Sequence, residues 1–171
     1  MKKVFLMTML MFLVGAAANA QKYALIDMEY ILKNIPAYER ANQQLDQKSK
    51  QWQAEVESAR NAAKTMYENF QNQSSSLSAV QKKNRENEIV AKENAANALK
   101  VKYFGQDGEL YKERENLIKP IEDKVSAAVK DIALARGYSM VIDRASAQNI
   151  VYASPSIDIS RAVLTKLGYS K

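Results

Sequence analysis

The longest uninterrupted pattern in the chain runs from Pro36 to about Gln73, where the sequence contains no Gly and no second Pro. Apolar or small residues recur there in steps of three and four, which places them along one face of an α-helix. At about 1.5 Å of rise per residue, this helix is about 55 Å long and too long to be enclosed in a compact domain of this size. The residues of this stripe are Tyr38, Ala41, Leu45, Trp52, Val56, Ala59, Ala63, Met66 and Phe70.

A polar stretch from Asn72 to Ser76 ends this helix, because its side chains compete for backbone hydrogen bonds. Ser78 is the predicted N-cap of a return helix of almost sixty residues that ends at Arg136-Gly137. A short connection forces successive helices to lie antiparallel, so the sequence predicts a coiled-coil-like helical hairpin with its tip near residues 71–78. The apolar side of the return helix is formed by Val80, Ile89, Leu99, Tyr103, Leu110, Leu117, Ile121, Val125 and Ile132.

The return helix contains three residues that favour bending, namely Gly105, Gly108 and Pro120. Each Gly costs about 1 kcal/mol relative to Ala in a helix interior. The seam is also thin, since polar residues occupy several of its positions. Two interpretations stay open: a marginal coiled coil, or an arm whose flexibility serves a function. The polar seam positions are Lys48, Asn87, Asn94 and Asn97.

Both ends of the chain predict short strands. Tyr23–Asp27 is a brief apolar run without helical spacing, followed by a short helix over Met28–Ile35. Near the C-terminus, Tyr138–Asp143 and Asn149–Ala153 are the predicted strands of a β-hairpin, joined by a polar turn. Asp158 is the predicted N-cap of a last helix that carries Ile159, Val163, Leu164 and Leu167 and stops at Gly168.

The predicted fold class is therefore α+β, mostly α. Residues 21–36 and 120–171 form a small β-containing body, and residues 37–119 form the helical hairpin arm. Three short strands and two short helices bury little apolar surface in one chain. We therefore expect a homo-oligomer in which copies of the body share one core, with an interface or core made by Leu25, Ile26, Met140, Val141, Ile142, Ile150 and Val151.

Residues 1–20 have the pattern of a secretory signal peptide. Lys2 and Lys3 precede an apolar run from Val4 to Ala18, and Ala18-Asn19-Ala20 supplies small residues for cleavage after Ala20. The apolar run has about 15 residues where a membrane span needs about 20, which disfavours an anchor. No Cys stands at the cleavage point, so a bacterial lipoprotein is excluded.

Composition excludes most enzyme classes. The 171 residues include no Cys and no His, which removes thiol and imidazole chemistry and the usual zinc or haem ligands. No phosphate loop, nucleophile elbow or metal spacing is present, so we expect no catalysis, cofactor or metal. The formal net charge of +6 raises nucleic-acid binding as a possibility. Interspersed acidic residues and the export signal weigh against it.

Four C-terminal segments, read together with the N-terminal strand and the charged hairpin, carry a resemblance to a known family. They are Ile118-Lys119-Pro120-Ile121, Gly137-Tyr138-Ser139-Met140-Val141-Ile142-Asp143, Val151-Tyr152 and Asp158-Ile159-Ser160. The chain resembles the Skp (OmpH-like) family of periplasmic chaperones over its whole length after the signal peptide. The last fifty residues are the distinctive part of the match.

The resemblance implies a periplasmic homotrimer whose three arms enclose a cavity. Such proteins hold unfolded outer-membrane proteins without ATP and prevent their aggregation. The family also has a proposed lipopolysaccharide-binding cluster of basic residues. Lys82, Lys83 and Arg85 near the tip invite the comparison, although such a charge run is more often a solvated helix face.

Apolar side chains on the arm are the candidates for contact with an unfolded chain, because Met and aromatic residues suit variable partners. Trp52, Met66 and Phe70 also fit a role in packing the hairpin seam, whereas Tyr67 and Phe104 lie off the main stripe. The competing function is that of a coiled-coil envelope spacer or oligomerisation protein without chaperone activity. The candidate contact residues are Trp52, Met66, Tyr67, Phe70, Tyr103 and Phe104.

Overall fold

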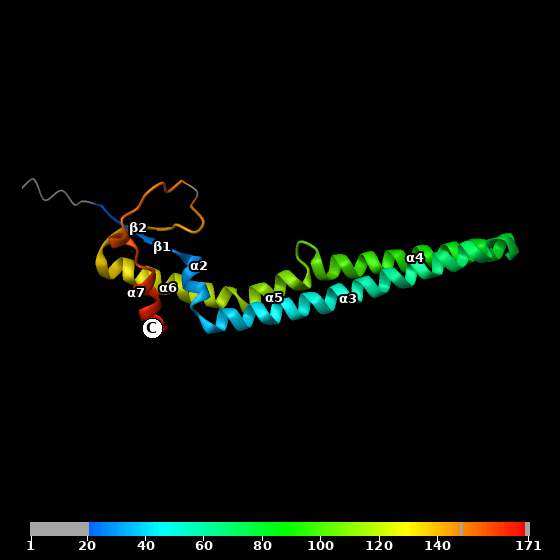
Figure 1. Ribbon diagram of the computed structural model, residues 1–171, viewed down its shortest axis with the longest axis horizontal. Coiled ribbons are helices and arrows are strands. Elements are labelled where there is room, and N and C mark those ends of the chain that lie inside the picture. The colour runs from blue at the N-terminus through cyan, green and yellow to red at the C-terminus, as the bar shows by residue number, and fades with distance from the viewer. Residues whose placement is uncertain (1–20, 148, 170–171) are drawn as a thin grey trace, which may run out of the picture. The chain divides into compact units, whose positions relative to one another are not determined.

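A computed structural model describes residues 21–147 and 149–169, so the predicted signal peptide lies outside the described residues. The described chain divides into two compact units (Figure 1). Residues 32–124 form what we call the hairpin unit, and residues 21–31, 125–147 and 149–169 form the terminal unit. Within the described ranges, no helix is both long enough and apolar enough to cross a membrane.

The first long helix of the hairpin unit is α3 (Pro36–Gln73), with the predicted bounds. Pro36 stands in its first turn, where the missing backbone N–H leaves no hydrogen bond unmade. Every residue of the predicted stripe, from Tyr38 to Phe70, is buried or half-buried. The helical spacing in the sequence therefore identified the packed face of α3.

The tip of the hairpin is a 3₁₀ turn, η1 (Ser74–Ser76), followed by α4 (Ala79–Phe104). Ser78 is the N-cap of α4, as predicted. Its Oγ accepts a hydrogen bond from the Gln81 N–H (3.4 Å), and Gln81 Oε1 accepts one from the Ser78 N–H (2.9 Å). This reciprocal capping box satisfies two backbone donors that the helix itself cannot pair.

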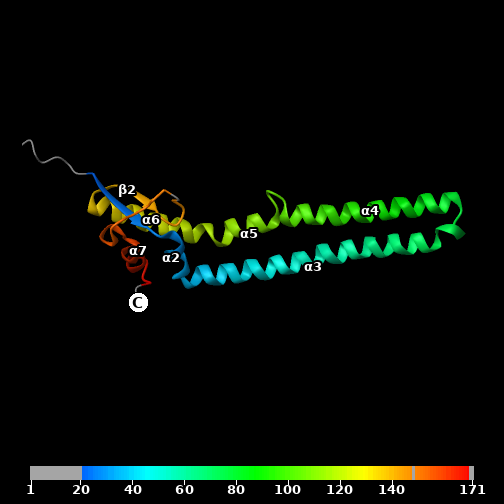
Figure 2. The ribbon, with the colours of Figure 1, turned by 45° about the horizontal axis from the view of Figure 1, so that its top comes forward.

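The predicted return helix is not continuous. It forms three helices: α4, α5 (Glu109–Leu117) and α6 (Lys119–Arg136). A loop at Gly105–Gly108 bulges out between α4 and α5 (Figure 2). A Cβ on Gly105 would lie 2.5 Å from the Val101 carbonyl oxygen, and one on Gly108 would lie 2.8 Å from the Tyr103 carbonyl oxygen. Only glycine fits either position without a backbone shift.

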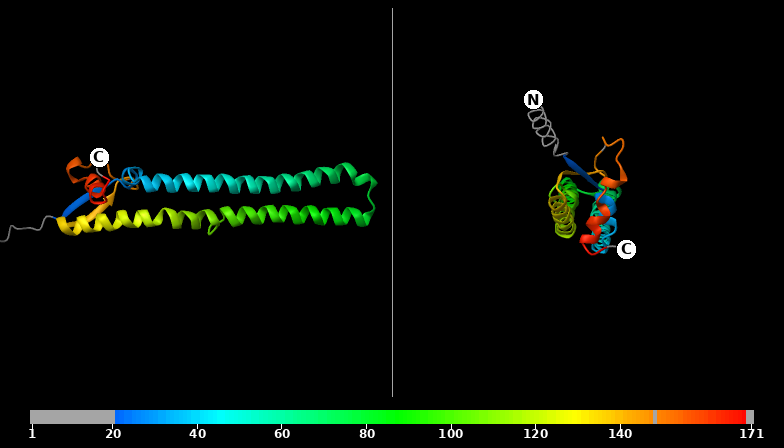
Figure 3. Two further views of the ribbon diagram at one scale, coloured as in Figure 1. Left: turned by 90° about the horizontal axis from the view of Figure 1, so that it is seen from below. Right: turned by 90° about the vertical axis from the view of Figure 1, so that its left-hand side faces the viewer.

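Helix α3 packs against both α4 and α5 in an antiparallel arrangement (Figure 3). The fully buried seam is small, as expected, and consists mostly of short side chains. Some predicted seam positions were wrong: Val80 is 71% exposed, and Asn87, Asn94 and Asn97 are exposed. Two helices cover only a narrow strip of each other, so these positions lie outside it. The buried seam residues are Ala41, Val56, Ala63, Ile89, Ala96 and Tyr103.

The terminal unit is built around β1 (Lys22–Ile26), which pairs in parallel with β2 (Tyr138–Asp143). On the other edge of β1, the Leu25 carbonyl accepts a hydrogen bond from the Ile159 N–H (2.9 Å). Helix α7 (Ser160–Lys166) follows directly. The buried apolar side chains of this unit are Ala24, Leu25, Ile26, Ile31, Val125, Ala128, Ile132, Ile159, Val163 and Leu164.

The predicted strand over Asn149–Ala153 is wrong, and so is the predicted β-hairpin. The segment forms no strand: Ile150 is half-buried, and Val151 is fully exposed. The apolar, β-branched composition fits a strand, but a strand needs an edge to pair with. Within the described residues the sheet contains only β1 and β2, and the segment does not return to pair with the outer edge of β2.

The helix ends of the terminal unit largely follow the prediction. Helix α2 (Met28–Lys33) is two residues shorter than expected. The predicted N-cap of the last helix was wrong by one residue: α7 begins at Ser160 and its N-cap is Ile159, while Asp158 Oδ1 accepts a hydrogen bond from the Ser160 N–H (2.8 Å). Gly137 and Gly168 have φ angles of +68° and +84°, and thus end α6 and α7 in a conformation that favours glycine.

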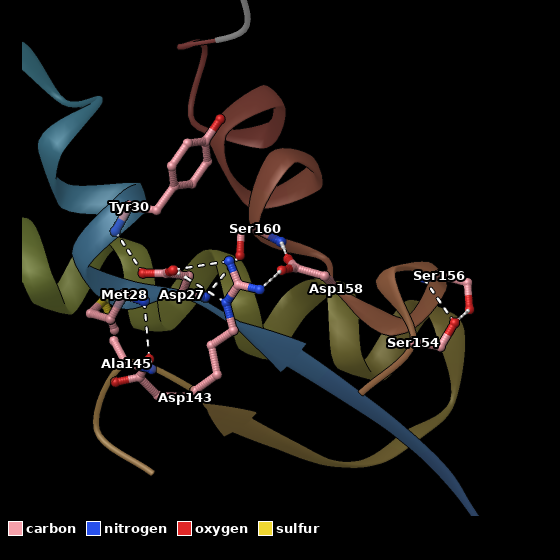
Figure 4. Close-up of polar contacts among 10 residues, drawn as sticks. Asp27, Met28, Tyr30, Asp143, Ala145, Ser154, Ser156, Asp158 and Ser160 are labelled. Carbon is pink, nitrogen blue, oxygen red and sulfur yellow. Dashed lines mark hydrogen bonds and ion pairs between the residues drawn. The ribbon is translucent and has the colours of Figure 1, made fainter. Parts of the chain in front are cut away.

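A polar cluster joins distant parts of the sequence within the terminal unit (Figure 4). Arg144 forms ion pairs with Asp27 (3.0 Å) and Asp158 (3.4 Å). The buried Ser160 hydroxyl accepts a hydrogen bond from the Asp27 N–H (2.8 Å), and Asp143 Oδ1 accepts one from the Met28 N–H (3.0 Å). The ends of β1 and β2 and the start of α7 are therefore held together by charge and hydrogen bonds.

We expect Ser160→Ala to lower the free energy of unfolding by about 1–2 kcal/mol, because the Asp27 N–H loses the buried hydroxyl as its acceptor. Urea unfolding followed by circular dichroism measures this change. The control is Ser139→Ala at an exposed position of β2, for which a change below about 0.5 kcal/mol is expected. Equal effects of the two variants would contradict this account of Ser160.

We expect Ser78→Ala to weaken the start of α4 by about 1 kcal/mol, because the capping box is lost. Amide hydrogen exchange in the first turn of α4 should accelerate about fivefold, while exchange near Tyr103 stays unchanged. Ser75→Ala, in the exposed 3₁₀ turn, is the matched control. An unchanged exchange rate in Ser78→Ala would show that the cap does not stabilise this end.

Candidate functional site

A cluster of aromatic side chains lies where α4 ends in the hairpin unit. The rings of Trp52 and Tyr103 are stacked, with centroids 5.1 Å apart and planes 7° from parallel. Phe104 meets Tyr103 edge-on, with centroids 6.4 Å apart. The Lys102 ammonium lies 5.1 Å from the centre of the Tyr103 ring. Such arrangements add about 0.5–1.5 kcal/mol for each ring pair, beyond the burial of area.

The Tyr103 hydroxyl donates a short hydrogen bond to Glu55 Oε2 (2.6 Å), which links α4 back to α3. This bond raises the pKa of Tyr103 above its ordinary value, and burial of the ring and the negative charge of Glu55 act in the same direction. Glu55 and the ring of Trp52 thus hold Tyr103 in place from the α3 side. Tyr103 is a packed residue whose hydroxyl stays protonated over the ordinary pH range.

A groove of the hairpin unit lies beside the Gly105–Gly108 loop, and we call it the mid-arm groove. It is open to solvent and has a volume of about 640 Å³. Both polar and apolar side chains line it. Its lining includes Tyr38, Leu45, Asp46, Phe104, Leu110, Tyr111 and Arg114.

A second groove of about 330 Å³ lies nearer the tip, and we call it the distal groove. It is lined by Arg60, Lys64 and Tyr67 from α3, and by Glu93 and Asn97 from α4, above the buried alanines of the seam. Ser49 in the mid-arm groove and Arg60 in the distal groove are eleven residues apart, close to three turns of α3. Both grooves therefore open on the same side of α3.

The structure places the predicted contact residues in different settings. Phe104 lines the mid-arm groove, and Tyr67, which is 49% exposed, lines the distal groove. Met66 and Phe70 are half-buried on α3. One face of the Trp52 ring packs against one face of the Tyr103 ring.

Sequence reasoning missed Tyr111 and misjudged Tyr38, which it assigned to the seam alone. Both line the mid-arm groove, and Tyr111 is 50% exposed. Helical spacing could not find Tyr111, because the loop at Gly105–Gly108 resets the phase between α4 and α5. Gly105 and Gly108, three residues apart, were the sequence signal that the helical spacing before and after them must be counted separately.

The predicted interface residues also fall into different settings in the terminal unit. Leu25 and Ile26 are buried within one chain, and Val141 and Ile142 are half-buried. Met140 and Val151 expose most of their apolar side chains, as does the neighbouring Tyr152. These exposed side chains have no apolar cover from the part of the chain that is described.

The basic run near the tip is only partly paired. Arg85 forms an ion pair with Glu88 (3.0 Å), Lys83 is exposed and Lys82 is half-buried. In residues 21–147 and 149–169, no three acidic side chains gather in a way that could hold a metal ion.

We expect the emission of Trp52, the only Trp in the sequence, to report the titration of Tyr103 directly. The Glu55 hydrogen bond favours the neutral phenol, so its stabilising effect is present below pH 10 and is lost as pH rises through the higher folded-state pKa. Quenching of Trp52 should therefore have its midpoint above that of the urea-unfolded chain. Tyr103→Phe should abolish this transition, and a transition that persists in the variant would contradict the assignment.

Comparisons with known proteins agree on one family. The family model "Outer membrane protein (OmpH-like)" matches residues 22–167. The chain is 29% identical to the chaperone protein Skp of Yersinia enterocolitica over 90% of each chain, and 27% identical to that of Pectobacterium atrosepticum over 98% of this chain and 99% of the relative. The fold is similar to that of an OmpH-like outer membrane chaperone from Caulobacter crescentus, with a TM-score of 0.65 and 15% identity over 86% of this chain and 83% of that one. With the family model matched across both the hairpin unit and the terminal unit, the chain belongs to the OmpH-like (Skp) family.

Proposed function

We propose that the protein is an ATP-independent periplasmic holdase that binds unfolded outer-membrane proteins and prevents their aggregation. One observation carries the proposal beyond family membership. Two open grooves on one side of a thinly packed hairpin present half-exposed aromatic rings among charged side chains. A chaperone of this kind needs such a surface, because it must attract apolar segments and stay soluble itself.

The chemistry of the expected client matches these grooves. A segment of an unfolded β-barrel alternates apolar side chains with polar ones and carries unpaired backbone groups, so it aggregates when strands find one another. The grooves are shallow and open, which favours many weak contacts over one tight one. Weak contacts of this kind allow capture and later release without ATP.

The assembly we propose is a homotrimer held by the terminal units, with a client cavity between the three arms. A two-stranded sheet is marginal by itself in water. Met140, Val151 and Tyr152 leave apolar surface uncovered in the single chain, and contact with identical copies would bury it. Leu25, Ile26, Val141, Ile142 and Ile150 complete the proposed shared core.

Arm flexibility is the second structural element of the proposal. The Gly105–Gly108 loop interrupts the backbone hydrogen bonding of the return segment, and Pro120 stands in the first turn of α6 after a second break at Ile118. We propose that the hairpin bends at these residues to admit clients of different size.

The decisive assay is light scattering of a urea-unfolded outer-membrane β-barrel protein diluted into buffer with increasing amounts of this protein. We expect suppression by the wild-type chain. Tyr67→Ser combined with Phe104→Ser should need about fivefold more protein for the same suppression, because about 1 kcal/mol of apolar contact is lost.

The matched control is Val90→Ser combined with Val101→Ser, two exposed residues of α4 that line neither groove. This variant should stay within about twofold of wild type, and circular dichroism should show equal helix content in all three proteins. Absence of suppression by the wild-type chain would favour the spacer alternative. If both double variants lost suppression of aggregation to the same extent, the grooves would not be the surface that binds the client.

A further inference from the structure

The mid-arm groove carries one uncompensated charge. Two of its lining side chains are charged, Asp46 and Arg114. Asp46 is neutralised by Lys50, whose ammonium lies 2.6 Å from Asp46 Oδ2. Arg114 makes no ion pair and no side-chain hydrogen bond with any residue in the described part of the chain, although its carbonyl accepts the Ile118 N–H. The charge left over in the groove is therefore a guanidinium.

Arg114 is set among aromatic side chains. Tyr38, Phe104 and Tyr111 line the same groove, and Phe104 and Tyr111 keep part of their rings in contact with solvent. The volume of about 640 Å³ is in the range of pockets that hold a small ligand, about 300–1,000 Å³. It is large enough for more than one side chain of a bound segment.

This combination selects for a particular occupant. An aromatic wall gains most from an apolar ring, whereas a guanidinium gains most from a carboxylate, which it can bind through two parallel hydrogen bonds. A basic segment would be repelled by Arg114. A purely apolar segment would leave the guanidinium without a charged partner. Charge complementarity therefore favours an occupant that brings a ring and a carboxylate together.

We propose that the mid-arm groove binds extended polypeptide segments in which an aromatic residue lies next to Asp or Glu. The ring packs against Phe104 and Tyr111, and the acidic side chain pairs with Arg114. This inference rests on the proposed holdase function and adds a sequence preference to it. Captured clients are then held first at their aromatic-acidic segments.

The test uses three dye-labelled nine-residue peptides with blocked termini on a Ser/Gly background. Their central pairs are Phe-Asp, Phe-Lys and Ala-Asp, and binding to the full protein is followed by fluorescence anisotropy. We expect the Phe-Asp peptide to bind about threefold to fivefold more tightly than either of the others. An exposed ion pair, which Phe-Lys lacks, contributes up to about a factor of five, and a ring contact, which Ala-Asp lacks, contributes a similar factor.

Arg114→Gln should remove the preference for Phe-Asp over Phe-Lys while keeping the preference for Phe over Ala. Lys92→Gln is the matched control, because it removes the same charge from an exposed residue of α4 outside the groove. Tyr111→Ser, at a half-exposed position that should tolerate it, is expected to weaken both Phe peptides equally.

Equal binding of the Phe-Asp and Phe-Lys peptides by the wild-type protein would overturn the inference. So would an equal effect of Arg114→Gln and Lys92→Gln, because net charge alone would then explain the preference. If aggregation is suppressed but the peptides are not distinguished, the groove assignment fails and the holdase function stands. If neither suppression nor peptide binding is seen, both fail.

Discussion

Strand β1 is hydrogen-bonded on both of its edges, and this constraint sets the course of the whole chain. One partner is β2, and the other is the segment at Asp158 and Ile159, so both come from the last part of the sequence. Parallel neighbours require a long crossover connection, and here that connection includes the entire hairpin unit. The cluster around Arg144, Asp27 and Ser160 then fixes the start of α7 against the end of β1.

The hairpin unit balances internal packing against exposed binding surface. Half of its six buried seam residues are alanines, and Val56, Ile89 and Tyr103 are the larger members. Such a seam lets two helices approach closely but removes little apolar area from water. The larger aromatic side chains therefore remain partly outside it, and they line the two grooves. The narrow seam that limits the buried apolar area therefore leaves the aromatic surface that the proposed function needs.

The sequence predicted those features that depend on local spacing and capping. The bounds of α3, the Ser78 cap and the glycine stops at Gly137 and Gly168 all follow from such patterns, as does the first strand, which was predicted over Tyr23–Asp27 and is found over Lys22–Ile26. Features that depend on pairing between distant segments, or on a break within a helix, were not predicted. Asn149–Ala153 has a strand-like composition but does not pair with the open edge of β2 within one chain, and Tyr111 lies beyond a break that resets helical phase.

The proposed function depends most on terminal units that join identical copies, so that the hairpins of these copies can hold one client chain together. Sedimentation equilibrium of the purified protein, alone and with an equimolar urea-unfolded β-barrel protein, tests this directly. The account predicts a trimer in the absence of client and a single soluble complex of three copies with one client chain. A stable monomer that stays monomeric when the client is added would contradict it.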